Sequence, residues 1–286
     1  MSLNGGDRLY IARSLPDALA ALGDRGPAGA PLAGATWIMR APIRQERLAR
    51  SYVAISKIDE LRHVEILDSE IKIGACVTHA ALAASLAPLP ECRALAQAAA
   101  NSANPAVREV ATIGGNLCAA AFAASDMAPA LICLDAAIDV RTPGGSERMS
   151  VERFLAIRTS IEPSCLVRSV VVPRAARRSV HMRLPLRKAG DYPVAIVSLA
   201  AMLDPNGLVE KARVAVGSIE PAARRWNRLE AELIGHRLDP ERAAEKAGEY
   251  AADFRGRDGV EAPGWYRVKV LASLVRRAVQ ALQENA

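Results

Sequence analysis

The stretch that decides the fold is Ala111-Thr112-Ile113-Gly114-Gly115-Asn116. A glycine pair lets the backbone adopt positive φ and lets a ligand approach the main chain without a Cβ in the way. Successive N–H groups in such a turn form a concave nest that holds an anion. The residues that follow, 117–124, are small or apolar, so this is no solvated surface loop. The sequence therefore predicts an anion-binding turn at Gly114 and Gly115.

A second, weaker glycine loop lies upstream at Leu32-Ala33-Gly34-Ala35-Thr36 and is followed by Trp37. Its single glycine gives the backbone the same kind of freedom at one position. Two such loops in one chain suggest a ligand with more than one phosphate. Taken alone, however, each loop is also compatible with a tight connection that binds nothing.

Other sequence signatures of nucleotide binding and hydrolysis are absent. The chain has no Gly-x-x-x-x-Gly-Lys-Ser/Thr, no Gly-x-Gly-x-x-Gly, no His-Glu-x-x-His and no Gly-x-Ser-x-Gly. The histidines are far apart in sequence, and His79, which follows a predicted helix cap, is interpreted as structural or surface-exposed. The sequence therefore indicates neither a hydrolase triad nor a metal cage.

Length and hydropathy suit two moderate domains or one large one. The chain has 286 residues, of which 51% are hydrophobic, which is enough to bury a sizeable core. No stretch approaches the roughly 20 apolar residues that a membrane helix needs. Residues 1–7 carry no basic patch followed by an apolar run, so we expect no secretory leader and a cytoplasmic protein.

Charge and cysteine content narrow the choice of partners. The net charge is +6, but the arginines are dispersed and aromatic residues make up only 4% of the chain, so nucleic-acid binding is not expected. A basic face for a protein partner or an anionic ligand fits better. The five cysteines are scattered, with no Cys-x-x-Cys pair. We expect buried reduced thiols, with neither a zinc site nor an iron–sulfur cluster in this chain.

Local patterns predict an α+β chain that changes character in its last third. Apolar periodicity and capping residues predict helices at 17–22, 78–85, 95–100, 127–134, 150–155, 227–234, 240–252 and 266–282. Alternating or continuous apolar runs predict strands at 64–67, 71–75, 137–141, 166–172, 181–187, 194–203 and 208–218. The last three strands predict an antiparallel sheet. The polar, basic stretch 174–179 predicts a boundary between domains at 1–175 and 176–286.

Both loops resemble motifs of one family. Residues 112–116, followed by Leu117, match the Thr-Ile-Gly-Gly-Asn motif of the FAD-binding medium subunit of the molybdenum hydroxylases, the family of carbon monoxide dehydrogenase and xanthine dehydrogenase. Residues 32–36 are similar to its Leu-Ala-Gly-Gly-Thr motif. Looser similarities follow in the family's order over nearly the whole chain, at 125–131, 166–173, 187–193, 212–217 and 266–277. This chain has Ala35 where the family usually has glycine, and Trp37 where a small polar residue is common.

The resemblance implies a two-lobed FAD-binding domain followed by an antiparallel sheet with helices. It implies a cofactor site made of both loops and four more distant residues: Leu32, Ala33, Gly34, Ala35, Thr36, Trp37, Thr112, Ile113, Gly114, Gly115, Asn116, Asp126, Leu166, Arg183 and Tyr192. It also implies two partners, a large molybdopterin-binding subunit and a small [2Fe–2S] subunit, in a dimer of heterotrimers. No catalytic residue and no metal ligand are expected in this chain.

The same resemblance implies a role for each group in the site. Backbone N–H groups of both loops would contact the FAD pyrophosphate, with side-chain hydrogen bonds from Thr36 and Asn116. Asp126 would accept a hydrogen bond from a ribose or adenine donor, and Leu166 would touch the adenine. Tyr192 would pack beside the isoalloxazine, and Arg183 would face an electronegative part of that ring.

Two other functions remain open from the sequence alone. One is a free-standing FAD-dependent reductase of the same fold. The other is a flavin-free structural or assembly subunit, which the departures at Ala35 and Trp37 leave open, because a methyl group at a position that needs positive φ would crowd the pyrophosphate.

Overall fold

The structure, a computed structural model, describes residues 8–120, 122–162, 164–186 and 192–284. Its α-helices are α1 (Leu15–Arg25), α2 (His79–Leu86), α3 (Arg93–Asn101), α4 (Pro105–Arg108), α5 (Ile113–Cys118), α6 (Met127–Cys133), α7 (Val151–Ile157), α8 (Asn227–Leu233), α9 (Pro240–Glu249), α10 (Gly264–Lys269) and α11 (Leu271–Glu284). Its strands are β1 (Leu9–Ile11), β2 (Gly29–Leu32), β3 (Ser51–Ala54), β4 (Val64–Ile66), β5 (Glu70–Gly74), β6 (Ala137–Thr142), β7 (Gly145–Ser150), β8 (Leu166–Pro173), β9 (Arg178–Pro185), β10 (Pro193–Leu203), β11 (Val209–Gly217) and β12 (Arg224–Arg225).

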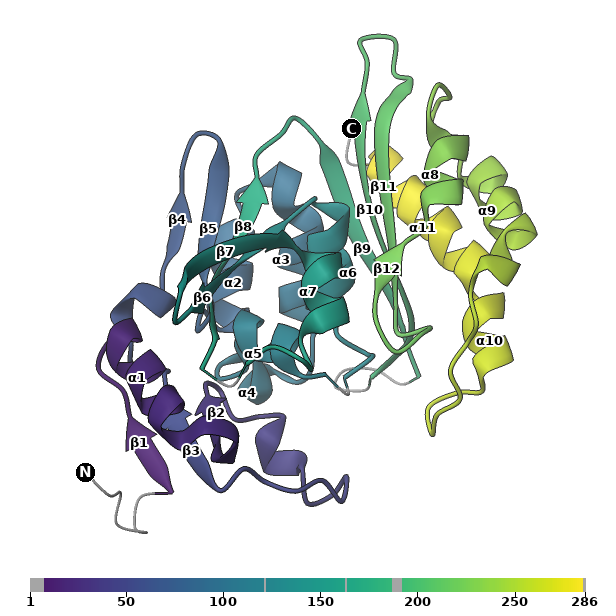
Figure 1. Ribbon diagram of the computed structural model, residues 1–286. Coiled ribbons are helices and arrows are strands. Elements are labelled where there is room, and N and C mark those ends of the chain that lie inside the picture. The colour runs from purple at the N-terminus through teal and green to yellow at the C-terminus, as the bar shows by residue number, and fades with distance from the viewer. Residues whose placement is uncertain (1–7, 121, 163, 187–191, 285–286) are drawn as a thin grey trace.

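A small first lobe forms the N-terminal end of the molecule. Its parallel strands lie in the order β1-β3-β2, and helix α1 packs beside them (Figure 1). The helix starts at Leu15, slightly before the predicted start at 17, because the Ser14 side chain caps it by accepting a hydrogen bond from the Asp17 N–H at 3.3 Å. Its apolar face buries Leu15, Ala18 and Leu22 in the core of this lobe.

The second lobe contains a five-stranded antiparallel sheet in the order β4-β5-β8-β6-β7. The hairpin of β4 and β5 confirms the alternation seen in the sequence at 64–75. Thr78 and Ser150 cap α2 and α7, as predicted, each accepting a backbone N–H at 3.2 Å. The core of this lobe joins the sheet to helices α2, α3, α6 and α7.

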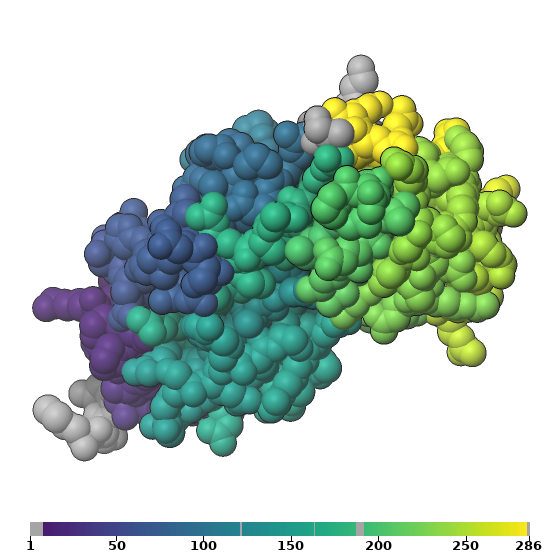
Figure 2. Space-filling model, turned by 90° about the horizontal axis from the view of Figure 1, so that it is seen from above, coloured from purple at the N-terminus to yellow at the C-terminus, as the bar shows by residue number. Residues whose placement is uncertain are grey.

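A four-stranded antiparallel sheet in the order β12-β11-β10-β9 forms the last part of the chain. Helices α8, α9 and α11 cover one face, while α3 and α6 lie against the other (Figure 1). In β10, Val197 and Leu199 join the helical core on the first side, and Ala200 joins the core of the second lobe. Both faces are buried, which explains why 194–203 is almost continuously apolar. Figure 2 shows this part at the opposite end of the molecule from the first lobe.

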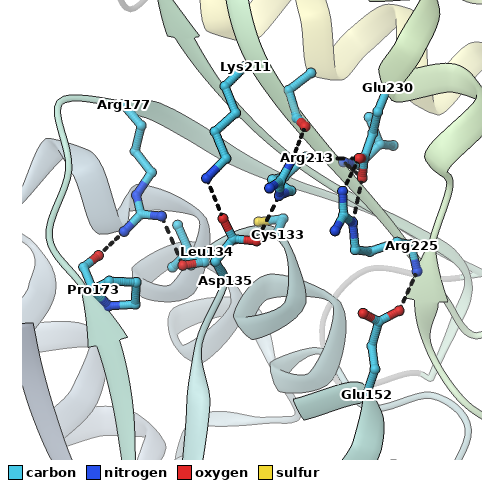
Figure 3. Close-up of polar contacts among 12 residues, drawn as sticks. Cys133, Leu134, Asp135, Glu152, Pro173, Arg177, Lys211, Arg213, Arg225 and Glu230 are labelled. Carbon is cyan, nitrogen blue, oxygen red and sulfur yellow. Dashed lines mark hydrogen bonds and ion pairs between the residues drawn. The ribbon is translucent and has the colours of Figure 1, made fainter. Parts of the chain in front are cut away.

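Ion pairs fasten the second lobe to the last sheet (Figure 3). Asp135, just after α6, accepts hydrogen bonds from Lys211 at 2.8 Å and Arg213 at 2.7 Å on β11. Glu230 on α8 is buried and accepts from the Val214 N–H at 2.9 Å and from Arg225. The bonds of Asp135 therefore join the second lobe to β11, whereas those of Glu230 join α8 to β11 and β12 within the last part.

One predicted helix is wrong in its extent. The stripe at 266–282 forms two helices, α10 and α11, with the helical path interrupted at Val270. Arg267 is fully buried in α10, where it donates to the Val194 carbonyl at 2.7 Å and pairs with Glu261 at 2.8 Å. The bond to Val194 ties α10 to β10. Within the described residues, every helix is too short or too polar to cross a lipid bilayer.

Candidate functional site

A cavity of about 470 Å³ lies where the two lobes meet strand β9. This volume falls within the roughly 300–1,000 Å³ typical of ligand pockets. Leu32 and Ile113 do not line it, since Leu32 ends β2 and Ile113 is buried in the core of the second lobe. All the other residues of the predicted site do: Ala33, Gly34, Ala35, Thr36, Trp37, Thr112, Gly114, Gly115, Asn116, Asp126, Leu166, Arg183 and Tyr192.

The first glycine loop offers free backbone donors to this cavity. Among the residues that the structure describes, no protein acceptor receives the N–H groups of Gly34, Ala35 and Thr36. Ala35 has φ 59°, in the left-handed region. A left-handed residue turns successive N–H groups toward one side, which is the nest geometry that binds anions. The conformation that the sequence predicts for Gly114 and Gly115 is therefore found at Ala35.

Gly34 brings the two glycine segments side by side. A Cβ at this position would lie 1.8 Å from the carbonyl oxygen of Val110, just before the second segment. No side chain fits there, so the first loop packs directly on the backbone of the second. This close approach, not a positive φ, is the reason for glycine at position 34.

The predicted turn at Gly114 and Gly115 is wrong, because both residues lie in helix α5 and neither has a positive φ. Thr112 caps this helix, accepting the Gly115 N–H on Oγ1 at 3.2 Å. The Gly114 N–H donates to the Ala75 carbonyl at 2.9 Å, so it is not available to a phosphate. A Cβ on Gly114 would lie 2.8 Å from the Cβ of Ala75. Gly114 therefore lets α5 pack closely on Ala75, just after the end of β5.

Asn116, near the end of α5, offers a side-chain donor to the cavity. The Ser125 hydroxyl donates to Asn116 Oδ1, which fixes the orientation of the amide. The NH₂ group of Asn116 is then left to donate elsewhere. A phosphate or carbonyl oxygen in the cavity is a suitable acceptor for it.

Asp126 and Arg183 bring a charge of each sign to the cavity wall. Arg183 on β9 donates through Nε to Asp126 Oδ1 at 3.1 Å, and the His181 ring contacts the same oxygen through Nε2 at 3.1 Å. Only 4% of Asp126 is exposed, so its charge depends on these partners. The Asp126 carboxylate is thus already hydrogen-bonded by protein, and it is its second oxygen that has capacity left for a ligand.

Three aromatic rings form another part of the wall. The ring of Phe122 lies between Trp37, at a centroid distance of 4.7 Å, and Tyr192, at 5.2 Å. Arg44 stacks over Trp37 at 3.7 Å, and Arg40 donates to the Tyr192 hydroxyl at 2.7 Å. The sequence predicts Trp37 and Tyr192 in this site but not Phe122 or Arg40, because residues so far apart in the chain carry no local signal of their contact.

His79 also lines the cavity and is buried, so of the two interpretations, structural or surface-exposed, the surface-exposed one is wrong. It is 3% exposed, its Nδ1 lies 2.7 Å from Ser102 Oγ, and its Nε2 has no hydrogen-bond partner in the described structure. Burial lowers the pKa of His79 to about 4, although Asp126 and the Thr112 carbonyl act in the opposite direction. The imidazole is therefore neutral near pH 7.

The cysteines form no cluster. Burial raises the pKa of Cys76 to about 12 and that of Cys92 to about 11, so these thiols stay protonated. Cys118 is exposed and Cys165 partly so, and both line the cavity, which corrects the expectation that the thiols are generally buried. In the part of the chain that the structure describes, no group of histidine, cysteine or carboxylate side chains is arranged to hold a metal ion. Most of the predicted segment 187–193 lies outside the described residues.

Comparison with protein families identifies this fold and cavity. The family model described as the FAD binding domain in molybdopterin dehydrogenase matches residues 4–175, and the model of the CO dehydrogenase flavoprotein C-terminal domain matches residues 181–282. The chain belongs to the FAD-binding medium subunits of the molybdenum hydroxylases. It is an FAD-dependent oxidoreductase subunit, as the motifs around both glycine segments predict.

Individual relatives of this medium subunit match it almost from end to end. The carbon monoxide dehydrogenase medium chain of Afipia carboxidovorans is 29% identical and is covered over 96% of each chain. The 6-hydroxypseudooxynicotine dehydrogenase complex subunit alpha of Paenarthrobacter nicotinovorans is 28% identical, over 94% of this chain and 92% of its own length. The xanthine dehydrogenase FAD-binding subunit of Escherichia coli is 25% identical, over 94% of each.

Solved structures agree with the fold. A chain of the Cu,Mo-CO dehydrogenase, in its cyanide-inactivated form, superposes with a TM-score of 0.90 over 100% of both chains, at 24% identity. A chain of the carbon monoxide dehydrogenase from Hydrogenophaga pseudoflava superposes with a TM-score of 0.89 over 98% of both chains, at 25% identity. The α+β architecture with antiparallel sheets, predicted from the sequence, is confirmed.

Proposed function

We propose that this medium subunit passes electrons from the [2Fe–2S] clusters of a small partner subunit through FAD to an external acceptor. A large molybdopterin-binding subunit would oxidise the substrate, and the complex would be a dimer of heterotrimers. The names of the relatives support a multi-subunit assembly, because they are a medium chain, a FAD-binding subunit and a subunit of a dehydrogenase complex. The protein would work in the cytoplasm.

The observation that carries this proposal is the shared cavity. It joins the free N–H groups of the first loop, the amide of Asn116 and an aromatic wall in one space. FAD needs donors for its pyrophosphate and flat apolar surface for its rings, so the residues present fit this cofactor. When bound, FAD supplies a ring that accepts electrons singly and releases them as a pair.

The first loop would bind the pyrophosphate. The N–H groups of Gly34, Ala35 and Thr36 would donate to phosphate oxygens, with the Thr36 hydroxyl and the Asn116 amide adding side-chain donors. A hydrogen bond to a charged acceptor contributes roughly 1.5–3 kcal/mol. Gly114 would shape the floor of the cavity without donating its N–H, which is engaged by Ala75.

The remaining residues would contact the other groups of the dinucleotide. Leu166 would touch the adenine, and the free oxygen of Asp126 would accept a hydrogen bond from a ribose or adenine donor. Tyr192 would pack beside the isoalloxazine, where Arg183 would face an electronegative part of the ring. The domain boundary would fall at 174–179, between 1–175 and 176–286.

Purification from the native source tests this function. We expect the chain to co-purify with a molybdenum-containing subunit and an iron–sulfur subunit, and its absorption spectrum to show flavin bands. A chain that runs alone and reduces an acceptor with its own flavin would favour the free-standing reductase. A chain in the complex that shows no flavin bands, even after incubation with FAD, would favour the structural or assembly subunit.

A further inference from the structure

Ser198 interrupts the apolar run of β10, and none of the roles above uses it. It is fully buried, with an exposed fraction of 0%. Its hydroxyl lies 2.8 Å from Nδ1 of His181, which is its partner in the register between β10 and β9. A buried hydroxyl in an apolar strand costs free energy unless it is hydrogen-bonded, and His181 satisfies it.

His181 links Ser198 to a residue that lines the cavity. Its side chain is fully buried, and its Nε2 lies 3.1 Å from Asp126 Oδ1. A carboxylate only accepts hydrogen bonds, so Nε2 carries a hydrogen and donates it. Nδ1 meets the Ser198 hydroxyl at 2.8 Å, so both ring nitrogens are held by partners and the orientation of the imidazole is fixed.

Asp126 Oδ1 is shared with Arg183, whose side chain is 13% exposed and lines the cavity. His181 and Arg183 are two residues apart on β9 and therefore lie on the same face of the strand. One chain of hydrogen bonds thus runs from Ser198 through His181 and Asp126 to the guanidinium. Without the His181 donor, Asp126 would lose one of its two fixed partners and could turn.

We propose that His181 is a positioning residue of the flavin site, which holds Asp126 and, through it, the Arg183 guanidinium at the cavity wall. This inference rests on the proposed function, in which Arg183 faces an electronegative part of the flavin. A cation held there stabilises negative charge on the reduced ring and raises its midpoint potential. A cation that is free to move stabilises it less.

Three variants of the flavin-loaded full chain, kept with its natural partners, test this role. His181→Phe removes the donor, and Ser198→Ala releases the ring. His181→Gln keeps an N–H near the position of Nε2 and should restore the midpoint potential of the flavin. His63→Gln is the matched control, because His63 contacts Asp59 at the same 3.1 Å on the exposed surface.

The readout is the midpoint potential of the bound flavin, measured by dye-coupled reduction, together with the FAD dissociation constant. We expect His181→Phe to change the oxidised-to-reduced ratio at fixed potential by about tenfold toward the oxidised form, which for two electrons is about 30 mV. Ser198→Ala should shift the same ratio toward the oxidised form by a smaller factor. The ratios of His181→Gln and His63→Gln should match that of the wild type.

Two results would overturn the inference. The first is a wild-type potential in both His181→Phe and Ser198→Ala while FAD stays bound, which would leave the proposed function intact. The second is a wild-type chain that binds no FAD in its complex, which would remove the proposed function and this inference together. If His181→Phe does not fold, Ser198→Ala decides alone.

Discussion

Arg183 Nε donates to Asp126 Oδ1 at 3.1 Å, and these two residues belong to segments matched by two different family models. Asp126 precedes α6 in the second lobe, and Arg183 lies on β9 of the last sheet. The pair therefore joins the two parts of the chain at the wall of the cavity.

Replacing Asp126 with alanine should strongly destabilise the chain. The substitution leaves Arg183 and His181 without their shared acceptor in a buried place, and removing one partner of a buried pair costs about 3–5 kcal/mol. Urea unfolding of the flavin-free chain measures this loss. Glu249→Ala breaks the exposed pair with Lys246 and serves as the control, with little expected change. Equal effects of the two substitutions would contradict the role given to Asp126.

Gly34→Ala should abolish the local structure of the first loop. Its Cβ would lie 1.8 Å from the Val110 carbonyl, so the two glycine segments would have to separate. We expect a loss of several kcal/mol, on the order of the largest single-residue effects, and no measurable FAD binding. Gly23→Ala is the matched control, because nothing lies within 4 Å of its Cβ in helix α1. It should stabilise by roughly 0.5–1 kcal/mol. Wild-type stability in Gly34→Ala would show that the loops are not packed as described.

Ala35→Gly should leave the fold intact and raise the free energy of unfolding by up to about 1 kcal/mol. The left-handed conformation at φ 59° costs an alanine about 1–2 kcal/mol, and the added flexibility of glycine in the unfolded chain cancels part of this gain. Ala83→Gly in α2 should instead destabilise by about 1 kcal/mol. Thermal unfolding compares the two variants. If both lose stability alike, Ala35 is not strained.

Acid should destabilise the wild-type chain partly through His79. Burial lowers the pKa of His79 to about 4, below its ordinary value of 6.5. Between these two values the unfolded chain binds the extra proton, so stability falls as the pH drops from about 6.5 to 4. The integrated loss is roughly 3 kcal/mol. Unfolding of the flavin-free chain at several pH values should show a steeper decline for the wild type than for His79→Gln. Parallel curves would mean that His79 titrates normally.

Local signals in the sequence predicted most of the elements. Capping side chains at Ser14, Thr78 and Ser150 act within three residues of their partners, so the helix starts could be found without knowing the fold. The continuous apolar run of β10 is likewise a local pattern, and it is typical of a strand buried on both faces. Such patterns depend on neighbours in the chain.

The errors arose where distant contacts decide the conformation. Gly114 is helical because α5 packs against Ala75. The glycine pair in the sequence gives no sign of this contact. The site itself was largely predicted through the family resemblance, yet its electrostatics were not. His181 meets Asp126 across 55 positions, and no local pattern connects them. The backbone N–H groups that are free to bind a ligand could likewise be identified only from the hydrogen-bond partners of both glycine segments in the structure.

The most direct test of the central claim is a titration of the flavin-depleted complex with FAD, followed by flavin fluorescence, for the wild type and Gly34→Ala. The account predicts saturable binding of one FAD per medium subunit in the wild type and none in the folded variant. FAD binding of equal affinity in both, or no binding to the wild type, would contradict a cofactor site built on the first glycine loop.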